Sequence, residues 1–400
     1  MIRMRFAWHI TISLLLMALA LAPVASANEL TGQVSAEVRA FQKEALHQGQ
    51  EQNNASLALQ AEYFHEWESG ASLTFTPFAR VDSADDERTH MDIRELSYLW
   101  LGDSYEFRAG ISKVFWGSTE FVHLADIINQ DDGVEGPDGE DKLGQPMLHL
   151  SIPRDFGVLD LFVLPYFRER TFPGSGGRLR PSIVVDTDNP VYEDPDGEEH
   201  VDLAARYSHS IGVVDFGIYH FRGTGREPTL ILRITPEGQA LVPYYEQIDQ
   251  SGLDAQVVAG QWLLKFEGIR RTGQGEGYYA GTGGFEYTFT GIGQSAADLG
   301  VIVEYVRDDR GDAATTPFNN DIMAGFRLAF NDQSGTELLA GLASDLDKST
   351  RMLTLEASRR IGDDMKATIE ARSFVDVDDV DLIYDLSNDD YVLIELAYYF

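Results

Sequence analysis

Hydrophobic and polar residues alternate with a period of two along most of the chain, in segments of about ten residues, a length that suits strands tilted across a bilayer. The stretch 321–330 is a clear case, because every second residue from Ile322 to Phe330 is apolar. Such alternation gives a β-strand one apolar and one polar face. The pattern predicts a chain made mainly of strands, with helical periodicity only around 120–130.

We expect about 18 strands, with 16 as the alternative. They are predicted at 30–42, 55–67, 71–81, 91–101, 105–115, 145–153, 158–168, 200–209, 213–222, 245–258, 261–271, 278–289, 298–308, 321–331, 336–346, 351–361, 365–374 and 391–400.

The connections between these segments supply a second pattern. Up to residue 260, long connections follow the odd-numbered strands and short ones the even-numbered strands. The rule weakens at 272–277, 290–297 and 347–350 and returns at 309–320 and 375–390. Outer-membrane barrels alternate long external loops with short periplasmic turns in this way. The sequence therefore predicts an all-β, transmembrane, antiparallel up-and-down β-barrel with both ends periplasmic.

The two faces of the predicted strands differ chemically. Trp262, Leu264 and Phe266 share one face of their strand, whereas Lys265 and Glu267 share the other. A barrel in lipid with a wet interior needs apolar outer and charged inner faces. A soluble β-sandwich would show the same alternation, with its apolar faces in the core, so the chain ends have to decide between the two.

The first 27 residues have the pattern of a secretory signal peptide. Arg3 and Arg5 precede the apolar run 10–22, and Ala25, Ser26 and Ala27 form a cleavage site. The apolar run is short for a membrane anchor, since a spanning helix needs about 20 residues. We expect export and cleavage, which leaves 28–400 as a single barrel domain in the bacterial outer membrane.

The last ten residues, YVLIELAYYF, alternate and end on an aromatic residue. This resembles the terminal signal of outer-membrane barrels, which the barrel-assembly machinery recognises as a strand. Tyr398 and Phe400 are the candidate assembly residues. Aromatic girdles at the membrane interface are expected at Tyr98 and Trp100, at 285–289 and at the terminal aromatic residues.

The composition is strongly acidic. There are 65 Asp and Glu against 31 Lys and Arg, a net charge of −34, which becomes −36 once the leader is removed with Arg3 and Arg5. Such a charge repels nucleic acid and excludes it as a partner. It attracts cations, although acidic loops can also serve only for solubility. With no cysteine in the chain, disulfides and Cys-based metal or redox sites are excluded.

The connection 116–144 is the most informative one. Its first half is apolar enough to pack against other parts of the protein, and Ser118 is a suitable N-cap for a short helix. We expect the segment to fold into the barrel and narrow the pore; an external loop packed on its neighbours is the alternative. The constriction candidates are Trp116, Glu120, Asp126, Asp131 and Asp132.

Charged residues on the predicted inner faces would line the lumen, as rings of charge do in selective pores. They are Arg39, Arg80, Arg108, Arg168, Arg206, Arg327, Arg360, Arg372, Glu62, Glu106, Glu304, Glu356, Glu370 and Glu395. Alternatively, they pair across strands and fill the interior. We prefer a pore, because a barrel of this strand number is wide enough for an aqueous channel.

Catalysis and a resident cofactor are not expected. The sequence has no G-x-S-x-G elbow, and its histidines show no H-E-x-x-H spacing. The acidic runs 131–141, 186–199 and 376–381 offer the carboxylates that calcium prefers. Solvated acidic loops are the preferred interpretation, and no metal site is predicted.

Four blocks of sequence resemble a family of porin-like outer-membrane proteins of proteobacteria. They are FWGSTEFVHLADIINQDD (115–132), QIDQSGLDAQ (247–256), QWLLKFEGIRR (261–271) and GGFEYTF (283–289). The resemblance implies an outer-membrane barrel and no particular substrate. The Pro-Glu-Phe-Gly-Gly constriction motif of general trimeric porins is absent from the sequence, which argues against a trimeric general-diffusion role.

The sequence thus favours a porin-like channel that passes small solutes through a charge-lined lumen. The alternatives are a transporter for a hydrophobic compound, an outer-membrane lipid hydrolase, and an adhesive or structural barrel. Expected partners are outer-membrane lipid and lipopolysaccharide, the barrel-assembly machinery and small solutes. The identity of the solute and the oligomeric state stay open.

Overall fold

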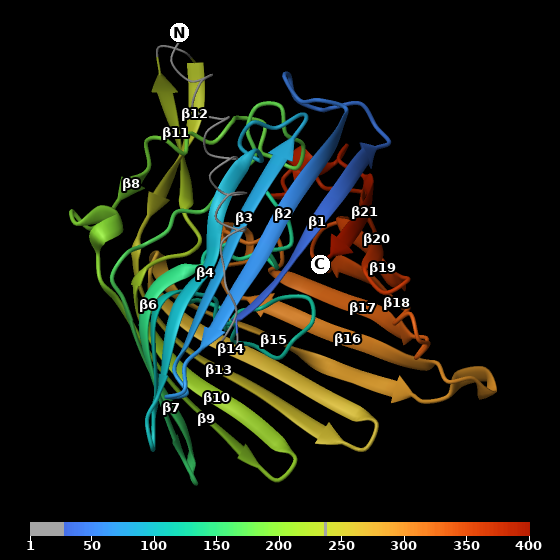
Figure 1. Ribbon diagram of the computed structural model, residues 1–400. Coiled ribbons are helices and arrows are strands. Elements are labelled where there is room, and N and C mark those ends of the chain that lie inside the picture. Colours follow the sequence, from blue (N-terminus) through green and yellow to red (C-terminus); the bar gives the residue numbers. More distant parts are fainter. Residues whose placement is uncertain (1–27, 236–237) are drawn as a thin grey trace.

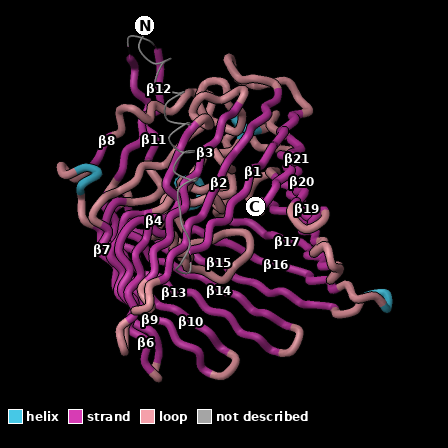
Figure 2. The backbone as a smooth tube through the Cα atoms, viewed as in Figure 1, coloured by secondary structure: helices cyan, strands magenta, loops and turns pink. Residues whose placement is uncertain are grey.

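Consecutive barrel strands are paired antiparallel along the chain, and the first strand pairs with the last. In the computed structural model, which describes residues 28–235 and 238–400, the 18 strands close in this way into one barrel (Figure 1). Figure 2 shows that the chain is mostly strand. The predicted fold class is confirmed. The predicted signal peptide, 1–27, lies outside the described residues.

The barrel strands follow the predicted ranges closely. They are β1 (Asn28–Phe41), β2 (Asn53–Glu66), β3 (Ser72–Asp82), β4 (His90–Leu101), β5 (Glu106–Ser112), β6 (Gln145–Arg154), β7 (Gly157–Leu164), β9 (Asp202–Ile211), β10 (Val214–Thr224), β13 (Gln247–Ala259), β14 (Trp262–Gly273), β15 (Gly275–Phe289), β16 (Asp298–Asp308), β17 (Asn320–Ala329), β18 (Glu337–Asp345), β19 (Arg351–Ile361), β20 (Met365–Val375) and β21 (Tyr391–Tyr399).

Two strands, β5 and β7, end three and four residues earlier than predicted, each for a local reason. After β5, the Asn129 side chain takes the place of a neighbouring strand: its Nδ2 donates to Ser112 O at 2.9 Å and its Oδ1 accepts from Val114 N at 2.8 Å. After β7 the chain reaches Pro165, which has no N–H to donate to a sheet.

The outer and inner faces lie as the alternation predicts. Trp262, Leu264 and Phe266 are 44–46% exposed on the outside, whereas Lys265 and Glu267 point inward and are 8% and 0% exposed. Apolar side chains on the outside and charged ones inside are what a barrel in lipid requires. Among the described residues, no helix has the length and hydropathy needed to cross a membrane.

Short turns gather at one end of the barrel together with both ends of the described chain. Gly32 N donates to Phe400 O at 2.9 Å, and Phe400 N donates to Gly32 O at 3.0 Å. The ring of Phe400 also covers Gly32, where a Cβ atom would lie 2.6 Å from Phe400 Cζ. The terminal aromatic therefore closes the seam between β1 and β21.

Three further strands form a small separate sheet that the sequence analysis missed. β8 (Val191–Tyr192), β11 (Thr229–Thr235) and β12 (Gly238–Tyr245) lie within the connections predicted at 169–199 and 223–244. The hairpin of β11 and β12 projects beyond the barrel at the end with the long loops (Figure 1). Those connections are thus partly ordered by their own backbone pairing.

The connection 165–201 is fastened to other long loops by buried arginines. Arg178 Nη2 lies 2.7 Å from Asp389 Oδ1 in the connection between β20 and β21. Arg180, 2% exposed, donates to four backbone carbonyl oxygens, among them Gln48 O between β1 and β2. Because buried donors left without acceptors are costly, these contacts hold the loops together at that end of the barrel.

Deleting Phe400 should lower the yield of folded barrel, because the deletion removes two backbone hydrogen bonds and the ring over Gly32. We expect a several-fold loss of the heat-modifiable form on gels of outer membranes. Phe400→Tyr, which keeps the ring and the backbone, is the control and should fold normally. Equal yields for the deletion and the wild type would show that the terminal residue has no special role.

Candidate functional site

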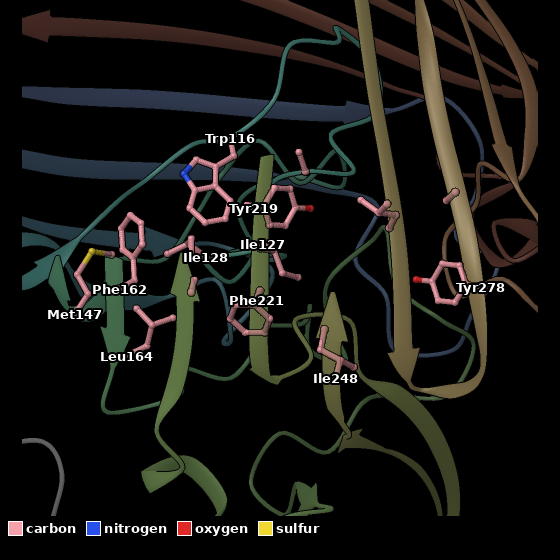
Figure 3. Packing of buried hydrophobic residues seen from close by; sticks show 14 residues of the cluster. Trp116, Ile127, Ile128, Met147, Phe162, Leu164, Tyr219, Phe221, Ile248 and Tyr278 are labelled. Carbon is pink, nitrogen blue, oxygen red and sulfur yellow. The ribbon is translucent and has the colours of Figure 1, made fainter. Parts of the chain in front are cut away.

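The segment 113–144, called the inner loop below, lies inside the barrel. Trp116, Ile127 and Ile128 are at most 4% exposed and belong to one cluster with inward-facing residues of β6, β7, β9, β10 and β13 to β15. Figure 3 shows these side chains between the loop and the wall, with Trp116 beside Tyr219. Burying this apolar surface stabilises the inward position of the loop.

Glu267 on β14 anchors the start of the inner loop. Its Oε1 accepts hydrogen bonds from Ser118 N at 2.7 Å and Thr119 N at 3.0 Å, and from the Thr119 hydroxyl at 2.6 Å. Its Oε2 accepts from Ala125 N at 2.8 Å. A fully buried carboxylate is therefore satisfied by the loop backbone, and the loop amides are satisfied by the wall.

Glu304 on β16 provides the second anchor. Its carboxylate accepts from Glu120 N at 2.8 Å and from Phe121 N at 3.1 Å. Phe121 then reaches β17 and β18, where a Cβ atom on Gly341 would meet its ring at 2.8 Å. Large side chains at this position of the wall would displace the loop.

The helix predicted near 120–130 is wrong, because no α-helix occurs in the described residues and Ser118 caps none. The physical reason lies in the two anchors. In a helix, the amides near the start stay free for a cap, and later ones bond carbonyls four residues back. Here Ala125 N, which in a helix would bond Phe121 O, donates to Glu267 Oε2 instead, and the backbone passes through bends and a turn between its contacts with the two anchors.

The second half of the inner loop crosses to the opposite wall. Glu135 accepts from Arg80 on β3, with Oε2 2.7 Å from Arg80 Nη2. Asp132 Oδ2 lies 2.6 Å from Arg94 Nη1 on β4. Asp132 and Glu135 are 1% and 8% exposed, so the solvated loop predicted for 131–141 is wrong at these positions.

A cavity of about 290 Å³ remains between this half of the loop and the wall of β1–β4, β20 and β21. Its basic side chains come from the first strands and the end of β5: Arg39, Arg80, Arg88, Arg94 and Lys113. Its acidic ones come from β1, β20, β21 and the loop: Glu37, Glu135, Asp138, Asp141, Glu370 and Glu395. The lining is therefore basic on β3 and β4 and acidic on β20 and β21, with both signs on β1.

Asp141 is the acidic group of the loop with the most unusual titration. Its side chain is open to the cavity, but it lies deep inside the protein and close to Glu135 and Asp138. Desolvation inside the protein, followed by repulsion from these carboxylates, raises the pKa of Asp141 to about 6. Its charge therefore changes at a pH of about 6.

The constriction candidates all lie in the inner loop, and each has a partner. Trp116 packs in the apolar cluster, and Glu120 pairs with Lys265 at 3.3 Å and with Arg327. The remaining three carboxylates are held by cations: Asp126 and Asp131 by Lys142, and Asp132 by Arg94. These pairs hold the shape of the loop, and none of the five candidates lines the cavity.

The predicted lumen residues lie on the inner faces of their strands, except Arg168, which follows β7. Several are paired with carboxylates: Arg206 with Asp254, Arg168 with Asp92, Arg108 with Glu95, and Arg372 with Asp138 and Glu370. Arg39, Arg80, Glu370 and Glu395 line the cavity. Glu62, Glu106, Glu356 and Arg360 are exposed on the inner face, away from the cavity lining. Some of the predicted lumen residues are therefore paired within the interior, and others are exposed on it.

Arg88 is a cavity residue that sequence reasoning missed. It follows β3 in a connection, where no alternation assigns a face, yet it is 3% exposed and reaches Glu37 and Asp82 at 3.0 and 2.8 Å. Although burial opposes its charge, these carboxylates raise the pKa of Arg88 above its ordinary value. The Arg88 guanidinium therefore keeps its positive charge in the lining of the cavity.

His90, Asp132 and Glu135 place three potential metal ligands within 4.8 Å of one another. Two guanidinium groups already occupy the carboxylates, Arg94 at Asp132 and Arg80 at Glu135. The Nδ1 atom of His90 lies 3.1 Å from a backbone carbonyl oxygen, so it carries the proton and Nε2 faces the carboxylates. A metal ion would be repelled by the arginines, and the group fits a protonated imidazole better.

No family model matches the sequence, and no curated protein matches it. Among solved structures, a loop-deletion mutant of OmpT, an outer membrane protein of Vibrio cholerae, is 9% identical with a TM-score of 0.47, covering 94% of this chain and 100% of its own. A mutant of the Rh. blastica porin is 10% identical with a TM-score of 0.47, over 93% and 100% of the two chains. Likenesses this distant carry no argument; the strand pairing itself defines the architecture.

Glu267→Gln should loosen the inner loop. The carboxylate accepts four hydrogen bonds, and the substitution replaces one of its two oxygens with an NH2 group, which donates and does not accept. We expect a loss of about 2–4 kcal/mol in stability, and faster hydrogen exchange of the amides in 118–126. Glu286→Gln, which changes an inward glutamate on the neighbouring strand, is the matched control. Unchanged exchange in the Glu267 variant would contradict the anchoring role.

Proposed function

We propose that this protein is a channel of the bacterial outer membrane that passes small hydrophilic solutes, with a preference for cations. The observation that carries the proposal is the inner loop, which two buried carboxylates hold across a charged lumen. A loop fixed inside a wide barrel narrows the lumen and leaves the charged cavity beside it. Charges on the walls then select the solutes that pass.

The cation preference rests on the balance of charge. The mature chain is strongly acidic, and the acidic groups of the cavity outnumber the basic ones. Most of the arginines near the cavity are already paired, for example Arg80 with Glu135 and Arg372 with Asp138. The carboxylates of Asp141 and Glu395 remain open toward the cavity. Cations are therefore attracted at both the loops and the narrow region.

A transporter for a hydrophobic compound is disfavoured by the same surfaces. The apolar cluster inside the barrel is filled by the protein's own side chains, with Trp116, Phe162 and Tyr219 in contact. The cavity that remains is lined by charged groups, which disfavours an apolar guest. No catalytic role enters the proposal.

Planar-bilayer recording of the refolded protein tests the channel directly. We expect discrete conductance steps and a reversal potential in a salt gradient that indicates cation preference. The native chain has no cysteine, so a single cysteine reports on one position. Charged thiosulfonate reagents should reduce the current of Gln60→Cys, since Gln60 lines the cavity. The adjacent Leu59→Cys faces lipid and should not respond. A silent bilayer would refute the channel.

Cation preference should fall as the pH is lowered through about 6, because Asp141 loses its charge below its raised pKa. Reversal potentials measured from pH 7.5 down to pH 5 would show this change, because the range extends about one pH unit or more to each side of the pKa of Asp141. Asp141→Asn should show the low-pH preference throughout. If the variant keeps the same step as the wild type, Asp141 does not control selectivity.

A further inference from the structure

Four outward-facing arginines lie at the end of the barrel that carries the long loops. They are Arg222 on β10, Arg270 on β14, Arg307 on β16 and Arg351 on β19, and all are exposed. Their neighbours along each strand face the interior; Ile269 and Arg271, for example, are 6% and 4% exposed. Among the described strand residues, no lysine or arginine points outward at this end of β1–β7, β9, β20 or β21. The outward arginines therefore occupy one arc of the wall, called the arginine arc below.

The arginine arc lies directly beside the apolar belt of the outer face. Tyr305 precedes Arg307 by two residues on the same face and is 42% exposed. Leu353 follows Arg351 by two residues on the same face and is 46% exposed. The belt of a barrel faces hydrocarbon, and the residues beyond it lie at the level of the lipid headgroups. An arginine at this level keeps its stem on apolar neighbours and its guanidinium in the polar layer.

Arg222 and Arg270 have no ion-pair partner within the part of the chain that the structure describes. The cross-strand partner of Arg222 is Asp249, whose Oδ1 lies 3.5 Å from His220 Nε2 instead. The guanidinium carbon of Arg270 lies 5.9 Å from the centre of the Tyr279 ring. This contact with an aromatic face leaves the N–H groups of Arg270 free for an acceptor. Two guanidinium groups on the outer wall are thus available to an anion.

The other two arginines of the arc are paired only at the surface. Arg307 Nη1 lies 3.7 Å from Asp347 Oδ2, and Arg351 Nη1 lies 3.7 Å from Asp376 Oδ2. All four side chains are more than half exposed. Exposed pairs of this kind contribute little to stability. An anion of the surroundings can therefore compete with these carboxylates.

The charge of the arc contrasts with that of the whole chain, which has a net charge of −34. Guanidinium groups bind phosphate through two parallel hydrogen bonds. Only β13 separates β10 from β14: Arg222 lies opposite Asp249 of that strand, and Arg270 lies opposite Ser251. The two arginines are therefore roughly 12 Å apart along the wall. A lipid that carries two phosphate groups can contact both.

We propose that the arginine arc binds the phosphate groups of lipopolysaccharide, the lipid of the outer leaflet, with Arg222 and Arg270 as its principal contacts. The basis is the charge complementarity between free guanidinium groups and lipid phosphates at the level of the headgroups. The proposal rests on the placement of the barrel in the outer membrane and not on conduction. Bound lipid covers the outer wall of β10, β13 and β14, whose inner faces hold the inner loop.

The test uses the refolded full chain in detergent, with fluorescently labelled lipid A that carries two phosphate groups as the probe. Fluorescence anisotropy should show saturable binding to the wild type. Arg222→Gln combined with Arg270→Gln should weaken binding at least fivefold. Arg222→Lys combined with Arg270→Lys keeps both charges and should bind more tightly than the glutamine variant. Arg359→Gln changes an exposed arginine at the opposite end of the outer wall and should bind as the wild type does.

Two results would overturn the proposal. One is equal binding by the wild type and the double glutamine variant, which would assign lipid binding to the apolar belt alone. The other is equal binding of lipid A and dephosphorylated lipid A to the wild type, which would show that the wall does not recognise phosphate. Heat-modifiable migration on gels verifies that each variant is folded. Neither result depends on whether the barrel conducts.

Discussion

The position of the inner loop depends on two carboxylates that meet backbone amides instead of cations. Glu267 and Glu304 would be very costly to bury alone, and the amides of a segment without regular secondary structure would be costly to bury without acceptors. Together they satisfy each other. This exchange fixes the first half of the loop against β13–β18 and leaves the second half to reach the arginines of β3 and β4. The place of the cavity follows from that crossing.

The barrel could be predicted from the sequence because its determinants are local and periodic. Alternation fixes the face of each residue, and the membrane fixes the length of each strand. The missed sheet shows where this reasoning ends. In Thr229–Thr235 the apolar residues Leu230, Ile231 and Leu232 are consecutive, so no period of two appears. The run of β-branched and apolar residues in both arms was the signal for a hairpin.

The site could be predicted only in part, for a similar reason. Inward residues such as Arg39, Arg80 and Glu304 follow from parity within a strand. The partners Glu135, Asp138 and Arg88 lie in connections, where parity does not apply and only the folded chain brings opposite charges together. The excess of acidic residues in 131–141 led to the prediction of a solvated loop, because the arginines that neutralise them lie on strands far away in the sequence. Three inward arginines on β1–β4, Arg39, Arg80 and Arg94, were the available signal of pairing.

The opposed charges of the cavity also act on molecules that carry no net charge. The lining groups from β3, β4 and the end of β5 are basic, and those from β20, β21 and the tip of the inner loop are acidic, while β1 carries both Glu37 and Arg39. The resulting field runs across the barrel axis. A dipolar solute that enters the cavity, such as a sugar or an amide, would align its dipole with this field. Whether the solute fits then depends on the cross-section that it presents in this orientation, viewed along the barrel axis.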